Sequence, residues 1–381
     1  MMIRRQFLRF SAIGAGALLV APRLALAAAQ TDRRFLFVIQ RGAADGLNTV
    51  IPYADPAYAQ LRGALAIDPT TATKLDAQFA LHPSLVEIGK MHGAGQALFV
   101  HAVASPYRER SHFDAQNVLE TGGTAPYRLR DGWLNRLTGM MTAQKEEAIA
   151  FAPTVPMALR GPADVTSYAP SALPQATDDL LARVGDLYTE DAQLDPLWRS
   201  AMATRGMAGE NGPKQDPASL GKLAAGFLAK PDGPRIAMIE TGGWDTHSGQ
   251  AGRLAAQLKA LDVMLANLRD GLGPVWNDTV VLVATEFGRT AAANGTGGTD
   301  HGTGSAAMLI GGAVKGGRVV ADWPGLAQAN LLDGRDLKPT AQLDALIAGA
   351  AGETFGIDPP RVARTLFADA VPRPMTGLVR T

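Results

Sequence analysis

The sequence lacks cysteine altogether and has no excess of charge of either sign. Without cysteine, neither disulfide bonds nor thiolate metal sites can form. Lys and Arg number 36, as do Asp and Glu, and charged residues make up only 19% of the 381 residues. That balance gives no reason to propose nucleic acid as a partner. Hydrophobic residues make up 46%, enough for a sizeable core in one large domain or two ordinary ones.

Histidine is also scarce, with only six in the chain. Three of them, His112, His247 and His301, stand in polar motifs. His101 lies inside an apolar run and is predicted to be a hydrogen-bonded core residue, whereas His82 and His92 are predicted to be surface or capping groups.

The N-terminus has the pattern of an export signal over residues 1–29. Arg4-Arg5-Gln6-Phe7-Leu8-Arg9 is a twin-arginine motif, Ala12 to Ala21 is apolar, and Ala25-Leu26-Ala27 suits cleavage. The apolar run is shorter than the roughly 20 residues of a membrane span, although an uncleaved anchor is the alternative. We expect the twin-arginine export machinery to carry the folded protein, and residues 30–381 to work in the periplasm or outside the cell without a stable membrane span.

A strand, a long helix and a further strand predict a mostly parallel sheet. Arg235–Glu240 and Thr279–Thr285 are short apolar runs typical of buried strands. Between them, leucines from Leu254 to Leu272 recur at spacings of three, four and seven and trace one helix face. This is a βαβ unit, and the fold is predicted to be α/β, with three layers around a mostly parallel central sheet.

The other predicted elements surround this unit. Strands are expected at 34–40, 97–103, 147–151, 157–160, 306–310 and 318–320, and helices at 81–92, 112–121, 131–141, 178–188, 191–204 and 217–230. The helices at 340–351 and 359–367 are expected on the surface. Residues 124–234 are predicted to form a helical cap or insertion over the pocket, within one domain spanning 30–381.

Polar loops follow three of these segments and carry good ligands for a divalent metal. Gly243-Trp244-Asp245-Thr246-His247 follows one strand, and Glu286-Phe287-Gly288-Arg289 follows another. Asp300-His301-Gly302-Thr303-Gly304-Ser305 leads into an apolar run. Since α/β proteins place their chemistry in loops at strand ends, we expect the three loops to share one pocket.

Two more polar positions are candidates for the same pocket. Asp45 follows the strand over 34–40 between Gly42 and Gly46, although a plain Asp-Gly turn is an equal alternative. Ser111 is predicted to begin the helix over 112–121, with Asp114 completing a capping box. A helix N-terminus favours anions, so Ser111 is either an N-cap alone or a nucleophile in an anion pocket.

These motifs, taken in order, resemble the alkaline phosphatase and sulfatase superfamily. More closely, the chain is similar to an exported bacterial family known as domain of unknown function 1501. The matching stretches are Arg41 to Gly46, Ser111 to Asp114, Gly243 to His247, Thr285 to Arg289 and Asp300 to Gly302. The resemblance implies an alkaline phosphatase-like fold and a divalent metal, which is Zn, Mn, Mg or Ca.

The same resemblance implies roles for individual residues. The expected metal ligands are Asp45, Asp245, His247, Glu286, Asp300 and His301. The expected catalytic residues are Ser111 as nucleophile, Arg110 and Arg289 as contacts to the anion, and His112. Where the phosphatase pattern has an Asp-His pair, this chain has Glu286-Phe287, so one imidazole is missing; His112 or Arg289 is available to fill its place, and the sequence leaves open one metal ion or none.

Two functions are compatible with these motifs. One is an exported, metal-dependent hydrolase of phosphate or sulfate esters, or of related anionic esters, with Ser111 attacking the ester. The other is a non-catalytic secreted protein that binds a partner or a surface glycan on a degenerate phosphatase-like scaffold. The expected partner is therefore a small anionic ester or a surface glycan.

Overall fold

The computed structural model describes residues 32–141, 148–169, 178–208 and 216–380. In this part of the chain, a nine-stranded sheet has the order β11-β5-β10-β9-β1-β8-β6-β7, with β12 pairing beside β5. The strands are β1 (Arg34–Gln40), β5 (Ala97–Ala104), β6 (Ala148–Phe151), β7 (Val165–Ser167), β8 (Ile236–Thr241), β9 (Thr279–Thr285), β10 (Ser305–Ile310), β11 (Arg318–Val320) and β12 (Ala341–Gln342). All neighbouring pairs are parallel except those of β10, which runs antiparallel to both β9 and β5.

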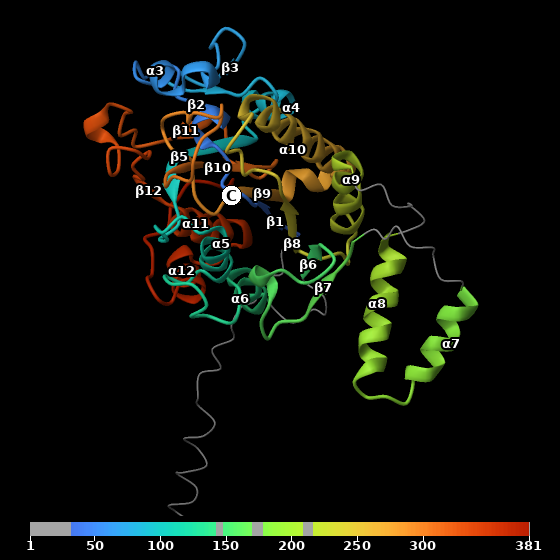
Figure 1. The fold of residues 1–381 in the computed structure, drawn as a ribbon. Helices are drawn as coiled ribbons and strands as arrows, with labels where there is room; N and C mark the ends of the chain where they lie inside the picture. The colour runs from blue at the N-terminus through green and yellow to red at the C-terminus, as the bar shows by residue number, and fades with distance from the viewer. Residues whose placement is uncertain (1–31, 142–147, 170–177, 209–215, 381) are drawn as a thin grey trace, which may run out of the picture.

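Helices cover both faces of this sheet, which makes three layers (Figure 1). One face packs against α4 (Val86–Gly93), α9 (Pro217–Leu228) and α10 (Gln250–Leu272). The other packs against α6 (Trp133–Met140), α11 (Leu343–Phe355) and α12 (Pro359–Leu366), and α5 (His112–Thr121) lies on the same side. Along β1, Phe35 and Phe37 belong to one core and Leu36 and Val38 to the other, because successive side chains of a strand point to opposite faces.

Smaller elements complete the described chain. A second sheet contains β2 (Val50–Ile51), β4 (Ala80–Leu81) and β3 (Thr73–Lys74). Short helices are α2 (Gly46–Thr49) and α3 (Tyr58–Arg62), with 3-10 turns η1 (Gly63–Leu65), η2 (Met157–Leu159), η3 (Gly273–Asp278) and η4 (Gln328–Asn330). No helix in the described residues combines the length and apolar character needed to cross a membrane.

The central βαβ prediction is confirmed. β8, α10 and β9 follow one another, and β1 lies between β8 and β9 in parallel register with both. The carboxyl ends of β1, β8 and β9 therefore lie side by side, and the loops that follow them begin at the same edge of the sheet. The predicted three-layer α/β fold with a mostly parallel sheet is likewise confirmed.

Residues 124–234, predicted as a cap or insertion, contribute partly to the central layers and partly to a helical projection. Strands β6 and β7 extend the central sheet beyond β8, and α9 packs on α10. Helices α7 (Asp178–Tyr188) and α8 (Leu194–Ala208) form a hairpin that projects away from the sheet (Figure 1). The predicted export signal over 1–29 lies outside the described residues.

Several local predictions were wrong. Residues 157–159 form the turn η2 instead of a strand. Helix α11 was predicted on the surface but is buried nearly throughout. Its alanines and glycines allow it to pack closely against both α12 and the sheet. His92 is buried against Phe99, whereas His82 is buried but does cap a turn, its Nδ1 accepting the Ser84 N–H. His101 is the predicted core residue: its Nε2 bonds the Val50 carbonyl at 2.8 Å.

Candidate metal centre

The centre of the site is the carboxylate of Asp245, in the loop that follows β8. The loop passes directly over the end of β1 at Gly42. A Cβ on Gly42 would lie 2.6 Å from the Asp245 nitrogen, and the Gly42 φ of +120° is one that side chains rarely adopt. Glycine at this position therefore lets Asp245 approach the sheet edge, where its side chain stays 43% exposed.

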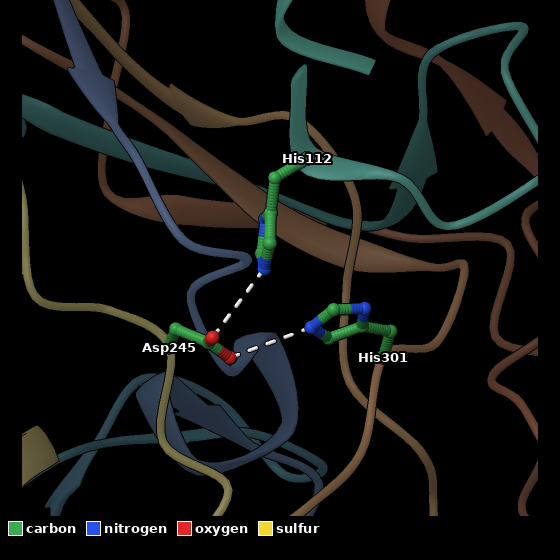
Figure 2. Close-up of side chains that lie close together, drawn as sticks. All are labelled: His112, Asp245 and His301. Atoms are coloured by element: carbon green, nitrogen blue, oxygen red, sulfur yellow. Dashed lines mark ion pairs between the residues drawn. The ribbon is translucent and has the colours of Figure 1, made fainter. Parts of the chain in front are cut away.

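Three histidines from different parts of the chain surround Asp245. His112 is the first residue of α5, while His247 and His301 lie in the loops after β8 and before β10. Figure 2 shows His112 and His301 pointing toward the Asp245 carboxylate. His247 Nε2 lies 3.1 Å and His301 Nε2 3.4 Å from Asp245 Oδ1, and His112 Nε2 lies 3.5 Å from Oδ2.

The Nε2 atoms face one another as well as the carboxylate. His247 Nε2 and His301 Nε2 are 2.9 Å apart. In the described part of the chain, His112, Asp245 and His301 form a group whose potential ligand atoms all lie within 4.8 Å of one another. A tetrahedral zinc ion with bonds of about 2.0 Å has ligand atoms roughly 3.3 Å apart, so the separations around Asp245 suit such an ion.

The opposite ring nitrogen, Nδ1, has a hydrogen-bond acceptor in every one of the three histidines. His112 Nδ1 meets Glu286 Oε1 at 2.8 Å, and His247 Nδ1 meets Asp300 Oδ1 at 3.1 Å. His301 Nδ1 meets the carbonyl oxygen of Arg110 at 3.0 Å. A carbonyl or an ionised carboxylate only accepts, so the contact at Nδ1 favours the tautomer with its proton on Nδ1, which leaves the Nε2 lone pair available to a metal ion.

The Nε2 atoms of His112 and His301 and the Asp245 carboxylate form one cluster, and His247 Nε2 lies beside it, in contact with His301 and Asp245. His112 Nε2 is buried and has no hydrogen-bond partner. Burial, followed by the proximity of His112, lowers the pKa of His301, so a proton is held weakly there. Imidazoles whose Nδ1–H donates to a carboxylate or carbonyl are the usual ligands of protein-bound zinc, and this donor set fits a divalent metal.

Glu286, predicted as a ligand, lies behind His112. Its side chain is 0% exposed, and Oε1 accepts hydrogen bonds from the Gly42 N–H and from Gln116 Nε2 as well as from His112. Burial acts to raise the pKa of Glu286, but the hydrogen bonds from His112 and Gln116 outweigh it and lower the pKa. The Glu286 carboxylate is therefore ionised. It orients His112 and does not itself face Asp245.

Asp300, also predicted as a ligand, has the equivalent place behind His247. Its Oδ1 accepts from Asn294 Nδ2 at 3.1 Å as well as from His247. Hydrogen bonds from Asn294 and then His247 lower the pKa of Asp300. Burial acts to raise the pKa of Asp245, yet the hydrogen bond and charge of Arg289 bring it below its usual range, so all three carboxylates are ionised near neutral pH.

Asp45 has a different environment from the one expected of a ligand. Its carboxylate is buried and pairs with the guanidinium of Arg62, at 2.5 and 3.0 Å. Asp45 also caps α2 through the N–H groups of Leu47 and Asn48. Gln250 completes the set by donating to Oδ2. The structure thus places both Asp45 oxygens in a buried ion pair instead of at the Asp245 cluster.

Arg289 is likewise engaged within the protein. Its side chain is fully buried, and it donates to Asp245 and to four backbone carbonyls, those of Gly42, Ala43, Trp244 and Thr299. These bonds join the ends of β1, β8 and β9 around Asp245. Arg289 therefore holds the loops together, and its donors are not free to contact a substrate as predicted.

Ser111 lies where predicted, at the N-cap of α5, but it does not form the predicted capping box. Its hydroxyl makes no capping bond to the helix. Burial raises the pKa of Tyr107 and hydrogen bonds from Ser111 oppose that rise, so the two residues are neighbours. Arg110, the other residue expected to meet an anion, donates to Asp336 at 2.7 and 3.0 Å.

Three residues that hydrogen-bond to the predicted site residues were not themselves predicted from the sequence: Gln116, Asn294 and Asp336. Gln116 follows His112 by four residues on α5, so helical periodicity places the two on one face and was a usable signal. Asn294 and Asp336 lie in irregular loops. No spacing in the sequence indicates their contacts.

The fold and the site define a mixed α/β protein with a His/Asp cluster at the carboxyl edge of its sheet. The chain belongs to the family described as Protein of unknown function (DUF1501), whose model matches residues 32–367, so the predicted family is confirmed. No curated protein sequence matches this chain.

Solved structures similar to this one include sulfatases and phosphonate monoester hydrolases. Ps i-CgsB, in complex with k-i-k-neocarrahexaose, is 9% identical with a TM-score of 0.41, over 86% of this chain and 73% of that chain. A putative sulfatase from Bacteroides thetaiotaomicron VPI-5482 is 10% identical with a TM-score of 0.38, over 89% and 75%. The phosphonate monoester hydrolase of Agrobacterium radiobacter is 12% identical with a TM-score of 0.33, over 86% and 84%. At such identities and TM-scores, these proteins assign no role to any residue here.

Proposed function

We propose that this protein is a metal-dependent hydrolase of phosphate or sulfate esters, exported by the twin-arginine pathway to the periplasm or beyond. One observation carries the proposal: His112, His247 and His301 each commit Nδ1 to an acceptor and turn Nε2 toward Asp245. Imidazoles oriented in this way around a carboxylate are the usual arrangement of metal ligands with outer hydrogen-bond partners. It suits a cation that is positioned for chemistry at an open sheet edge.

His112, Asp245 and His301 would hold the metal, with His247, which faces His301 and Asp245, as a further ligand. Three imidazole nitrogens and one carboxylate favour zinc over manganese, magnesium and calcium, which prefer oxygen ligands. When bound, a divalent metal would polarise an ester oxygen and favour the ionised form of a hydroxyl. Glu286 and Asp300 fix two of the rings from behind, and Arg289 supports the Asp245 carboxylate.

Ser111 is the proposed nucleophile. Ser111 is the N-cap residue of α5 and directly precedes His112, whose imidazole faces Asp245. In the proposed reaction the Ser111 oxygen bonds to phosphorus or sulfur while the bond to the leaving alkoxide breaks, and the alkoxide takes up a proton. Water then releases the phosphoryl or sulfuryl group from Ser111 as the inorganic ion and restores the hydroxyl.

The first experiment measures metal content and ester hydrolysis together. Protein purified without chelators is analysed for Zn, Mn, Mg and Ca and assayed on aryl phosphate and aryl sulfate esters. We expect wild type to contain a transition metal and to hydrolyse one of the two classes, Ser111→Ala to keep the metal but lose turnover, and His301→Ala to lose both. His92→Gln, a buried histidine on α4 outside the site, is the control and should keep both.

A protein without metal and without turnover would contradict the proposal. If Ser111→Ala binds metal and still hydrolyses the ester, Ser111 is not the nucleophile, but the metal-dependent hydrolase is still supported. Export is tested separately: replacing Arg4 and Arg5 by lysine should retain the protein in the cytoplasm, whereas unchanged secretion would contradict a twin-arginine signal.

A non-catalytic binding protein is the second candidate, and one observation favours it. Both arginines expected to contact an anionic substrate are engaged elsewhere, Arg289 with carbonyls and Asp245, and Arg110 with Asp336. In this case the protein retains metal and binds a sulfated or phosphorylated glycan without cleaving it. Equilibrium binding to such glycans, with no release of sulfate or phosphate over long incubation, distinguishes this function from the hydrolase.

A further inference from the structure

Asp336 is a buried acidic residue outside the group around Asp245, in the loop before β12. Its side chain is 0% exposed. Oδ2 accepts from Arg110 Nη2 at 2.7 Å and Nε at 3.0 Å, and from Thr303 Oγ1 at 2.8 Å. Oδ1 accepts from Arg335 Nη1 at 3.0 Å. One carboxylate oxygen thus ties together two segments that are far apart in the sequence, one at Arg110 and one at Thr303.

Both tied segments meet again at His301. Thr303 lies two residues after His301 in the same loop, and the Arg110 carbonyl accepts the His301 Nδ1–H at 3.0 Å. The distance between this carbonyl and the ring is therefore set from both sides by contacts to Asp336.

Arg110 itself has an unusual backbone conformation. Its φ is +61°, in the left-handed region that residues with side chains adopt only when their surroundings hold them there. The two hydrogen bonds from its guanidinium to Asp336 supply that restraint. They hold the Arg110 peptide in the orientation in which its carbonyl faces His301.

We propose that Asp336 is a positioning residue for His301, acting through Arg110, and that it sets the tautomer and direction of this imidazole at the metal centre. His112 and His247 are each oriented by direct contact with a carboxylate, from Glu286 and Asp300. For His301 the carboxylate is that of Asp336, which does not touch the ring but binds Arg110, whose carbonyl accepts from the ring. The role at the metal rests on the proposed function; the effect on the His301 tautomer does not.

The test compares Asp336→Asn with wild type in two measurements. The first is zinc affinity, by competition with a chromophoric chelator. Loss of an outer residue that orients a ligand weakens metal binding by roughly 10- to 100-fold, and we expect a loss at the lower end of that range. The second is the ¹⁵N spectrum of the His301 ring in metal-free protein, which should show a proton on Nδ1 in wild type and a mixture of tautomers in the variant.

Matched controls separate positioning from a general effect on the loop. Arg335→Ala removes another hydrogen bond to Asp336 from a partly exposed side chain and should leave zinc affinity and tautomer unchanged. Arg110→Gly combined with Asp336→Asn removes the tether without backbone strain, since glycine accepts a positive φ. This variant should lose affinity as Asp336→Asn does, and it replaces Asp336→Asn if that variant fails to fold.

Wild-type zinc affinity and an unchanged His301 tautomer in folded Asp336→Asn would overturn the inference, as would an equal loss in Arg335→Ala. A wild-type protein that binds no metal would overturn the proposed function. The tautomer measurement in metal-free protein still tests the positioning by Asp336 in that case.

Discussion

His247 and His301 meet at their Nε2 atoms, 2.9 Å apart. Each ring has its other nitrogen committed, His247 to the Asp300 carboxylate and His301 to the Arg110 carbonyl. In a neutral ring, moving the proton to Nε2 would leave Nδ1 with no proton to donate to that partner. The two Nε2 atoms and the Asp245 carboxylate beside them are suited to bind a divalent cation.

Metal removal is expected to destabilise the protein. A ligand that binds only the folded state stabilises it by about 4 kcal/mol when its free concentration is 1,000 times its Kd. Denaturant unfolding with excess zinc and with a chelator should therefore give clearly different midpoints in wild type. His301→Ala should give the same midpoint in both conditions, and an identical response of variant and wild type would argue against a metal at this cluster.

Glu286→Gln should weaken the metal centre while leaving the fold intact. The substitution keeps the size of the side chain but removes the ionised acceptor of the His112 Nδ1–H, so we expect metal affinity to fall by roughly 10- to 100-fold. Chelator competition measures the change. Glu353→Gln is the control, because Glu353 also accepts several backbone N–H groups but belongs to α11 and bonds the C-terminal segment, away from the Asp245 cluster. Equal affinities in wild type and Glu286→Gln would exclude an orienting role.

Arg62→Leu should reduce stability without acting at the cluster. The Arg62–Asp45 pair is buried, and removing one partner of such a pair costs roughly 3–5 kcal/mol, because the other charge stays uncompensated. The double variant with Asp45→Asn should recover part of the loss, as measured by urea unfolding. The metal content of the double variant per folded molecule should equal that of wild type. A loss of metal in the double variant would indicate that Asp45 is a metal ligand.

His101 should make stability fall as the pH falls toward 4. Burial lowers the pKa of His101 to about 4, whereas in the unfolded chain it is about 6.5. Between these values the unfolded chain binds a proton that the folded chain does not, so folding is less favourable at the acidic end of the window. The difference corresponds to roughly 3 kcal/mol.

The variant His101→Gln tests this titration. Glutamine retains a donor for the Val50 carbonyl and an acceptor for the Ala102 N–H that His101 now bonds, but it does not titrate. The stability of the variant should depend less on pH than that of wild type between pH 6.5 and 4. Burial also lowers the pKa of His82 to about 4, and this contribution is present in both proteins. Parallel stability curves would show that His101 does not titrate in this window.

The elements that the sequence predicts best are those whose local pattern and boundaries agree. Strands β1 and β9 and helix α5 have the predicted bounds. The two strands are uninterrupted apolar runs, and α5 ends at Gly122, which adopts the left-handed conformation that glycine allows. The buried helix α11 was placed on the surface, because sequence periodicity does not show which elements cover a helix.

Residue chemistry and chain order determined that carboxylates and imidazoles would gather at one edge of the sheet, because parallel strands bring their carboxyl ends together. Which of them face the centre was decided only by tertiary packing. The docking of α5 turns His112 inward and leaves Glu286 behind it, and Arg62, distant from the motifs, takes both oxygens of Asp45. A sequence specifies what a side chain can bind, whereas its direction depends on contacts between segments that meet only in the folded chain.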